Sequence, residues 1–569
     1  MENATVAGLF RDIAQILQIK GENTFRIRAY ERAAQNIEAF SEDVKKLAEE
    51  GRLKEIPGIG GDLADKISEI IKTGKLRSYE ELKKSIPAGL IELLNIPSVG
   101  PKTARHLYEQ LNIKGIPDLE RAIEEHKLDR LPGIKEKTIH NIQRGIQILK
   151  SGQERMPLAY ADAAAREFID ALSALAFVKS LSLTGSLRRR KETVRDIDML
   201  AVSKEPEKVM DVFTGAPDVK EVLARGKTKS SVRTAEGIQV DLRVVEPGSF
   251  GAAMVYFTGS KGFNIKLRAM AQKKGWKINE YGVFSGDKYI AGRSEKEVFK
   301  ALGLSYIEPE LREDTGELEL ALKGKLPRLI EVGDLKGDLH VHSRWSDGND
   351  TIEEIAGVAR SKGYSYIAIA DHSVSLRVAG GLGLAELKKK KAQIDKINKK
   401  LKGLRLLYGT EVEIDSKGDI DYKDEVLKDF DIVVGAIHSG FKQPKAQLTK
   451  RIIRACRNKY VNIIAHPRGR LWGVREPYEL DFDQVLKAAA DTNTALEINS
   501  YTQRLDLNDV YSRRAKEEGV KLSIDSDSHN LAQLDMIRLG VDVARRAGLS
   551  REDIINTLPL EQLLKAIKK

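Results

Sequence analysis

The sequence is poor in the features that mark exported and membrane proteins. It contains one cysteine, Cys456, among 569 residues, so an intrachain disulfide framework is excluded and a reducing compartment is expected. It also lacks a charged-then-apolar leader and any uninterrupted apolar run of membrane-spanning length. We therefore expect a cytoplasmic protein that has no membrane partner.

The sequence also has only a small excess of positive over negative charge. Lysine and arginine number 95 and aspartate and glutamate 84, which gives a net charge of +11. This surplus permits a polyanionic partner without establishing one. The hydrophobic content of 41% is enough for packed cores, and the length predicts about three to five domains.

Histidines, by contrast, are concentrated near the C-terminus. Six of the nine lie between His340 and His529, each beside a strand-like run or a carboxylate. In a strand, residues i and i+2 point the same way, so His340 with His342, and Asp527 with His529, would each chelate. Apolar runs such as 366–370 predict parallel strands whose C-terminal ends converge in a barrel-like sheet. The candidate metal ligands are His340, His342, Asp347, His372, Glu411, His438, His466, Asp527 and His529.

The composition of this set indicates the chemistry. Imidazoles and carboxylates without a thiolate suit zinc, manganese or iron. Nine candidates exceed the needs of one ion, so two or three ions are expected. Clustered divalent ions lower the pKa of a bound water and stabilise charge on a phosphoryl group. The set therefore predicts phosphoester hydrolysis.

From about Asp334 to the C-terminus, this pattern resembles the PHP family, named for polymerase and histidinol phosphatase. All nine positions of that family's metal constellation are filled here. The resemblance implies a distorted (β/α)7 barrel that holds up to three Mn²⁺ or Zn²⁺ ions. An intact ligand set implies an active hydrolase rather than a structural relic.

The first 150 residues show apolar residues at helical spacing, broken by glycine-proline turns. Turns at 56–61, 96–101 and 131–135 each precede an amphipathic helix, with Lys135 replacing a glycine in the last and weakest copy. Such a turn exposes backbone N–H groups that can hold a phosphate, the helix-hairpin-helix pattern. Repetition favours DNA contact over a simple hairpin closure. The candidate DNA-binding residues here are Gly58, Gly60, Gly100 and Lys102.

Acidic residues on two later strand-like segments form a second constellation. Asp196 and Asp198 share one strand face, and Asp241 lies in the alternating segment 238–245. If the strands are neighbours, the three carboxylates can hold two Mg²⁺ ions, one activating a 3′-hydroxyl and one bridging a triphosphate.

A glycine-serine turn precedes the first acidic strand. Gly185 and Ser186 would allow close backbone approach to phosphates, and Arg188 and Arg189 would supply positive charge. An isolated D-x-D motif is weak, but this turn and the downstream Asp241 make the combined signal strong.

Residues 1–316 resemble the X-family DNA polymerases, the group that includes the vertebrate repair polymerase beta. With the PHP segment they match the two-part organisation of prokaryotic members. The resemblance implies that Asp196, Asp198 and Asp241 are catalytic and hold Mg²⁺, and that Arg268 contacts the template minor groove. The implied nucleotide-binding residues are Gly185, Ser186, Arg188, Arg189, Tyr256, Phe257, Gly259 and Asn264, with Tyr256 and Phe257 crowding the sugar.

Three further features have open interpretations. Some X-family members form a Schiff base through a lysine at the place of Lys66, but Asp62 replaces a usual basic residue, so Lys66 is either a lyase residue or simply solvated. The lysine run 388–391 is expected on a solvated face of a barrel helix. Arg468 and Arg470 follow His466 and Pro467 and could hold a DNA phosphate beside the metals, a role that the sequence leaves open.

The predicted fold is multidomain: helix-hairpin-helix domains, an α+β nucleotidyltransferase palm with a thumb, and an α/β PHP barrel. The predicted boundaries are 1–85 and 86–150 for the helical domains, 151–248 for the palm, 249–316 for the thumb, 317–333 for a linker and 334–569 for the barrel.

The predicted function is gap-filling DNA repair by a monomeric polymerase that uses dNTPs and carries a PHP 3′→5′ exonuclease. Its nuclease could extend to abasic-site cleavage and removal of blocked 3′ ends. Two alternatives remain. The PHP site could hydrolyse a small phosphate ester such as histidinol phosphate, or the polymerase half could be a non-catalytic DNA-binding scaffold.

Overall fold

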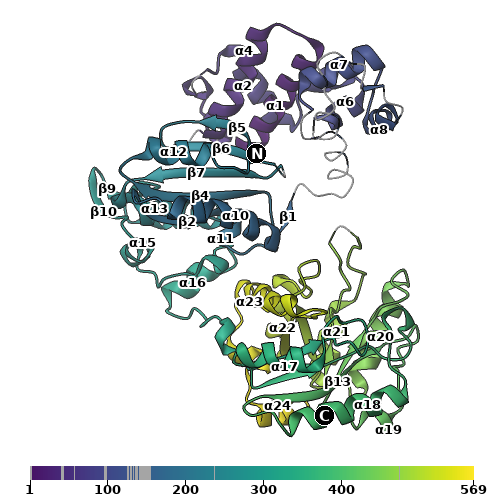
Figure 1. The fold of residues 1–569 in the computed structure, drawn as a ribbon. Helices are drawn as coiled ribbons and strands as arrows, with labels where there is room; N and C mark the ends of the chain where they lie inside the picture. The colour runs from purple at the N-terminus through teal and green to yellow at the C-terminus, as the bar shows by residue number, and fades with distance from the viewer. Residues whose placement is uncertain are drawn as a thin grey trace. The chain divides into compact units, whose positions relative to one another are not determined.

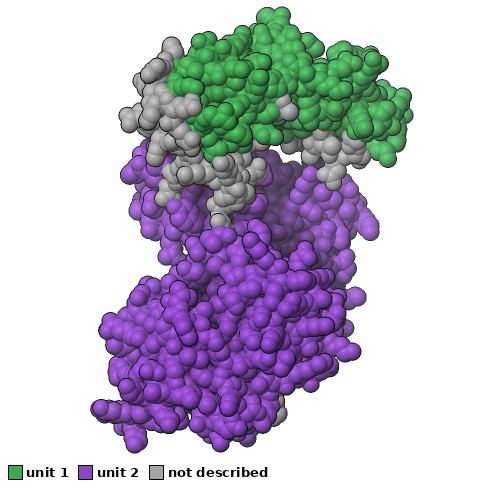
Figure 2. Space-filling model, turned by 90° about the vertical axis from the view of Figure 1, so that its right-hand side faces the viewer, with its two compact units in different colours: residues 1–154 green, residues 155–569 purple. Residues whose placement is uncertain are grey.

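The chain divides into two compact units, residues 1–154 and 155–569 (Figure 2). The six-part division expected from the sequence is finer than this and stays a prediction. The computed structural model describes residues 3–39, 44–56, 58–94, 96, 99–124, 127–128, 131, 134, 139, 142, 146, 155–235, 237–472 and 474–568.

The described part of the first unit is helical, as the apolar spacing predicts. Gly60 and Gly100, in extended conformation, immediately precede α4 and α7, so two of the expected glycine turns do lead into helices. The third turn involves Pro132, Gly133 and Lys135, which lie outside the described residues. The helices are α1 (Asn3–Lys20), α2 (Thr24–Ala39), α3 (Val44–Glu49), α4 (Gly61–Thr73), α5 (Arg77–Lys84), α6 (Ala88–Leu93), α7 (Pro101–Leu111) and α8 (Ile116–Glu124).

The second unit begins with a sheet of five strands in the order β2-β4-β7-β6-β5 (Figure 1). The strands β4 and β7 at its centre are parallel, whereas the other neighbours are antiparallel. Strand β7 alternates buried and half-buried residues, as expected for a sheet with one covered face. The elements are β1 (Met156–Pro157), α10 (Leu158–Ser173), β2 (Val178–Leu183), α11 (Gly185–Arg188), β3 (Thr193–Val194), β4 (Asp196–Ser203), α12 (Pro206–Thr214), β5 (Val219–Arg225), β6 (Lys229–Thr234) and β7 (Gln239–Val245).

A smaller helical layer with a three-stranded sheet, β10-β9-β8, follows the first sheet. Its core includes Phe263, Phe299 and also Leu318 of α16, so the segment expected to be a linker contributes a helix to this core. The elements are α13 (Phe250–Thr258), α14 (Lys261–Lys273), β8 (Lys277–Asn279), β9 (Gly282–Ser285), β10 (Lys288–Ala291), α15 (Glu295–Leu302), the short 3₁₀ helix η4 (Pro309–Leu311) and α16 (Glu317–Leu322).

The C-terminal part is a sheet of seven parallel strands in sequence order, β11 to β17, surrounded by helices (Figure 1). A parallel bridge between Val341 and Ser528 joins its first and last strands, so the sheet is a nearly closed barrel, which confirms the expected architecture. The elements are β11 (Gly337–Val341), α17 (Ile352–Ser361), β12 (Tyr366–Ile369), α18 (Leu384–Asn398), β13 (Arg405–Glu413), α19 (Asp424–Leu427), β14 (Ile432–Ala436), α20 (Lys445–Arg457), β15 (Ile463–Ile464), α21 (Phe482–Asp491), β16 (Ala495–Asn499), α22 (Asp509–Glu517), β17 (Leu522–Asp525), α23 (Ile537–Arg546) and α24 (Leu560–Ala566).

The lysine run on α18 corrects one expectation. Lys388 and Lys389 are exposed, as predicted, but Lys390 is 0% exposed. Its ammonium donates to the carbonyls of Ile369 and Gly409 and lies 2.8 Å from Asp371 Oδ2. A solvated position is therefore wrong for Lys390, because it neutralises a buried carboxylate.

Within the second unit, the first sheet and the barrel share one continuous hydrophobic cluster, which includes Leu158 and Val541. None of the helices in the described part of the chain combines the length and the apolar character that crossing a membrane requires.

Candidate active sites

Three aspartates meet on one face of the first sheet of the second unit. Asp198 of β4 stands directly beside Asp241 of the parallel strand β7, and Asp196 lies two residues before Asp198. Burial, followed by the charges of Asp196 and Asp241, raises the pKa of Asp198 to about 7. Burial and Asp241 also raise the pKa of Asp196. A half-buried group of mutually repelling carboxylates fits divalent cations, which would relieve this repulsion.

The turn before β4 packs directly against this group. Gly185 has a φ of +61°, and a Cβ added there would lie 2.2 Å from Asp198 Oδ2, so only glycine fits. The Thr184 amide donates to the carbonyl of Asp198 at 2.8 Å. Gly185 and Ser186 therefore begin α11 beside the carboxylates, where the sequence places them.

Arg188, the last residue of α11, and Arg189, which follows it, pair with the carboxylates of Glu295 and Glu313. Arg188 makes two hydrogen bonds to Glu295, of 2.6 and 2.8 Å. Burial alone would raise the pKa of Glu295, but Arg188 and Arg312 lower it to about 2. Arg189 donates to Glu313 at 2.9 Å and also contacts the Thr258 carbonyl.

The expected nucleotide-selecting residues also gather at one place. Tyr256 is 37% exposed and packs edge-on against Phe257, with ring centroids 5.1 Å apart. Asn264 donates to the Tyr256 carbonyl at 2.7 Å, and Arg268 donates to the Asn264 carbonyl at 3.3 Å. Gly259, with a φ of +69°, ends α13. Tyr256, Asn264 and Arg268 line a common small pocket.

The nine candidate ligands of the barrel converge at the C-terminal ends of its strands, where barrel enzymes place their active sites. Eight of them form three overlapping groups, and within each group the ligand atoms lie within 4.8 Å of one another. The groups are His342 with Asp347, His372 and His529; His340 with His342 and Asp527; and His372 with Glu411 and His438. The ninth ligand, His466, joins through its Nε2 atom, which lies 3.1 Å from Glu411 Oε1.

Electrostatics in this cluster are the reverse of those at the aspartates. Burial opposes ionisation of Glu411, but the charges of His438, His372 and His340 hold its pKa well below the usual range. Burial likewise opposes protonation of His372, but Glu411 and Asp347 raise its pKa to about 10. Burial prevails at two other imidazoles of the cluster, where it lowers the pKa of His342 to about 4 and that of His466 to about 3.

Several ring and carboxylate atoms of the cluster have no hydrogen-bond partner among the described residues. They are His342 Nδ1, His466 Nδ1 and Glu411 Oε2, all buried, of which Glu411 Oε2 lies 2.8 Å from His372 Nδ1 in an ion pair. Buried polar atoms without partners are uncommon. Their presence among imidazoles and carboxylates fits a site for divalent transition metals.

A second layer of acids, missed by the sequence reasoning, orients the histidines. Glu497 of β16 lies 2.7 Å from His340 Nδ1 and accepts from the His466 amide. Glu413 lies 2.8 Å from His438 Nδ1. Glu413 could have been found, because it stands two residues after Glu411 on the same strand. Glu497 had no such signal.

Arg504, which the sequence analysis did not single out, lies beside the ligands. Its Nε lies 3.4 Å from Asp527 Oδ2, and its Nε and Nη1 are buried without a hydrogen-bond partner among the described residues. Arg470 instead bonds Glu192 and the Leu505 carbonyl. Arg468 lies over the Tyr511 ring, 4.3 Å from its centroid.

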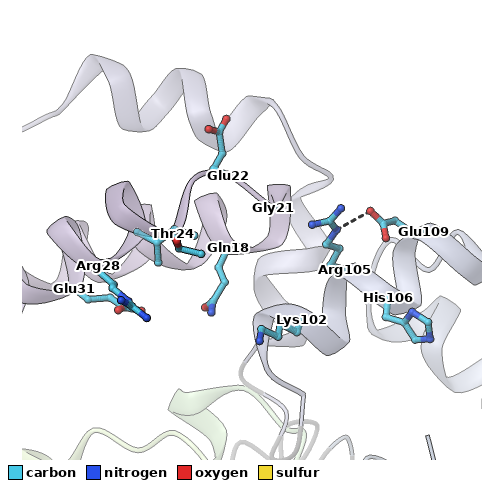
Figure 3. A pocket seen from close by; sticks show the side chains of 11 residues that line it. Gln18, Gly21, Glu22, Thr24, Arg28, Glu31, Lys102, Arg105, His106 and Glu109 are labelled. Atoms are coloured by element: carbon cyan, nitrogen blue, oxygen red, sulfur yellow. Dashed lines mark hydrogen bonds and ion pairs between the residues drawn. The ribbon is translucent and has the colours of Figure 1, made fainter. Parts of the chain in front are cut away.

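In the first unit, α7, the helix that follows the second glycine turn, lines a pocket of about 580 Å³ together with α1 and α2 (Figure 3). Lys102 lines it together with Arg28 and Arg105. Gly58, in the first glycine turn, has a φ of +78°. Arg105 is paired with Glu109. The pocket lining is Gln18, Gly21, Glu22, Thr24, Ile27, Arg28, Glu31, Lys102, Arg105, His106 and Glu109.

Lys66 lies on α4 in direct contact with Asp62 one turn earlier, and its side chain is 18% exposed. The residue that departs from the family pattern is thus the partner of the candidate lyase lysine.

Family models match four parts of the chain. They describe a helix-hairpin-helix domain over residues 1–76, a SAM-like helix-hairpin-helix tandem over 90–147, a DNA polymerase beta thumb over 253–313 and a PHP domain over 338–501.

Similar proteins match either the whole chain or a part of it. A Bacillus subtilis (strain 168) protein named DNA polymerase/3′-5′ exonuclease PolX is 38% identical over 100% of both chains. A Thermoanaerobacter sp. (strain X514) protein named as a probable phosphatase is 30% identical over 39% of this chain and 89% of its own. DNA polymerase lambda of Rattus norvegicus is 28% identical over 53% of this chain and 54% of its own.

Proposed function

This chain belongs to the PolX family, and we propose that it is a gap-filling, repair DNA polymerase that also trims 3′ ends at a separate, metal-dependent site. The observation that supports this most directly is the presence of two complete ligand groups in one unit. Three carboxylates face one another on β4 and β7, and nine ligands converge in the barrel.

In the polymerase site, Asp196, Asp198 and Asp241 would hold two Mg²⁺ ions. These ions, when bound, supply the charge that activates the primer 3′-hydroxyl and neutralises the triphosphate. Asp241 would help to activate the primer hydroxyl through the metal, while Asp196 and Asp198 would hold both ions. Gly185 lets its turn lie directly against Asp198, and Gly185 and Ser186 would receive the triphosphate there. Arg188 and Arg189, paired with Glu295 and Glu313, would lie beside it.

Sugar selection belongs to the neighbouring helix. Tyr256 and Phe257 crowd the position of the 2′-hydroxyl, and Gly259 and Asn264 support that segment. Arg268 contacts the template strand. These roles follow from the family pattern and from the common pocket of Tyr256, Asn264 and Arg268.

In the barrel, the nine ligands would hold up to three Mn²⁺ or Zn²⁺ ions. Such ions supply an activated water and stabilise charge on a phosphodiester. Glu497 and Glu413 fix the ring orientations of His340 and His438. Arg504 offers its buried guanidinium to a substrate phosphate.

The proposed substrates are gapped or primer-template DNA and dNTPs, with a monomeric protein acting in the cytoplasm. The glycine turns at Gly58, Gly60 and Gly100, with Lys102, would hold the DNA backbone. Abasic-site lyase action through Lys66 remains a weaker proposal, because Asp62 already occupies its ammonium. Borohydride trapping of a cross-link to abasic DNA, lost in Lys66→Ala, would test it.

A second candidate for the barrel is hydrolysis of a small phosphate ester, favoured by the similarity to a protein named as a phosphatase. Turnover of histidinol phosphate compared with turnover of DNA 3′ ends separates the two. Faster turnover of the small ester would replace the nuclease assignment.

The deciding experiment follows a 5′-labelled gapped duplex with Mg²⁺ or Mn²⁺, with and without dNTPs. We expect Asp198→Ala to lose extension on the order of 10³-fold while it keeps shortening. We expect His342→Ala to lose shortening while it keeps extension. Extension by Asp198→Ala would contradict the catalytic assignment, and no extension by the unmutated protein would support a scaffold.

A further inference from the structure

Helix α23 of the barrel contacts the turn that carries the proposed nucleotide-binding residues. The Arg546 guanidinium donates to the carbonyl of Arg189 at 2.7 Å and to Glu313 at 3.1 Å. Arg189 donates to the same Glu313 oxygen at 2.9 Å. Arg546 is 4% exposed and is itself held by Asp509 at 2.6 Å. This is a built contact rather than a surface ion pair.

The next residue along the turn is held from both sides. Arg190 makes two hydrogen bonds to Asp162 of α10, of 2.7 and 2.8 Å, and a third of 2.5 Å to Asp542 of α23. Its backbone φ is +55°, which is uncommon for a residue other than glycine. A backbone of this kind persists only where surrounding contacts hold it.

Backbone hydrogen bonds link the end of the turn to its beginning. The Arg189 amide donates to the Gly185 carbonyl at 3.3 Å, and the Lys191 amide donates to the Ser186 carbonyl at 3.1 Å. The turn is therefore closed on itself. Any shift of Arg189 or Arg190 would move Gly185 and Ser186 relative to Asp198.

We infer that Arg546 and Asp542 are positioning residues for nucleotide binding in the polymerase reaction, supplied by the barrel. The inference rests on the proposed function, in which Gly185 and Ser186 receive the triphosphate. Neither residue touches the reacting atoms. They hold the turn in one place, so their loss weakens nucleotide binding in the ground state and the transition state alike.

Adjacent to Arg546, the chain offers a matched control. Arg545 also leaves α23 toward the helical layer, where it donates to Glu310 at 2.7 Å and to the Ile330 carbonyl at 3.1 Å. It joins the same two parts of the unit but does not contact the turn. Arg545→Met therefore removes a comparable contact while leaving Arg189 and Arg190 in place.

The test measures kcat and the KM for dNTP on a gapped duplex with full-length protein, together with 3′ shortening without dNTPs. We expect Arg546→Met to raise KM about tenfold with kcat changed less than about twofold. The isosteric Asp542→Asn should raise KM about threefold. Arg545→Met should leave KM within about twofold, and all three variants should shorten DNA normally.

Equal increases in KM for Arg545→Met and Arg546→Met would overturn the inference, because they would show a general loosening. An unchanged KM in Arg546→Met would also overturn it. If Arg546→Met does not fold, Asp542→Asn decides the question by the same criterion. Failure of the proposed function is distinct, since the unmutated protein would then not extend the primer at all.

Discussion

In the two ligand groups of this chain, neighbouring side chains shift the pKa of a buried acid in opposite directions. At the β4–β7 site burial, followed by the charges of Asp196 and Asp241, raises the pKa of Asp198 to about 7. In the barrel, imidazoles surround Glu411 and lower its pKa despite burial. Neighbouring carboxylates therefore add to the effect of burial on the pKa of Asp198, whereas neighbouring imidazoles oppose the effect of burial on the pKa of Glu411.

The largest expected effect concerns the buried ion pair of Lys390 with Asp371 inside the barrel. Lys390→Met should leave Asp371 buried without its cation and lower the free energy of unfolding by about 3–5 kcal/mol. Urea unfolding followed by tryptophan fluorescence measures it. The exposed Lys389→Met is the control and should change stability by less than about 0.5 kcal/mol. Equal losses in both variants would refute the role given to Lys390.

A smaller effect is expected from the second layer of acids. Glu497→Gln should lower 3′ shortening about 10- to 100-fold, because His340 loses the carboxylate that orients its ring. Extension should not change, since Glu497 contacts His340 and His466 in the barrel. The exposed Glu425→Gln serves as control. Normal shortening by Glu497→Gln would remove this contrast between the sites.

The smallest effect should have the opposite sign. Without divalent ions at pH 8, Asp198→Asn should stabilise the protein by on the order of 1 kcal/mol, because it removes a repelled, half-buried charge. The folded pKa, about 7, lies above the ordinary 3.8, so the cost of ionisation grows as pH rises between these values.

The gain from Asp198→Asn should therefore be smaller at pH 5.5 than at pH 8. Thermal unfolding at both pH values measures it, with the exposed Asp287→Asn as control. Destabilisation at pH 8 would mean that the aspartates do not repel one another in the metal-free protein.

Much of both sites could be predicted from local sequence. Alternation along a strand places Asp196 beside Asp198 and His340 beside His342, and this needs no tertiary information. The pairing of Asp198 with Asp241 was conditional on neighbouring strands, and the structure supplies that condition.

Residues that act through distant partners could not be predicted. Lys390 resembled its solvated neighbours, because nothing nearby in sequence identifies Asp371 as its partner. Glu497 contacts His340 across 157 positions. Arg190 contacts Asp542 across 352 positions. A one-dimensional pattern reports which face a residue occupies, but not what the opposite face brings to it.

The bond between Arg190 and Asp542 also bears on how such a chain can evolve. A gene that lost its barrel would leave the Arg189 carbonyl without its Arg546 donor and Arg190 with only Asp162. Substitutions at either end must then be matched hundreds of codons away. In chains that keep both parts, substitutions at Arg190 and at Asp542 are therefore expected to accompany each other.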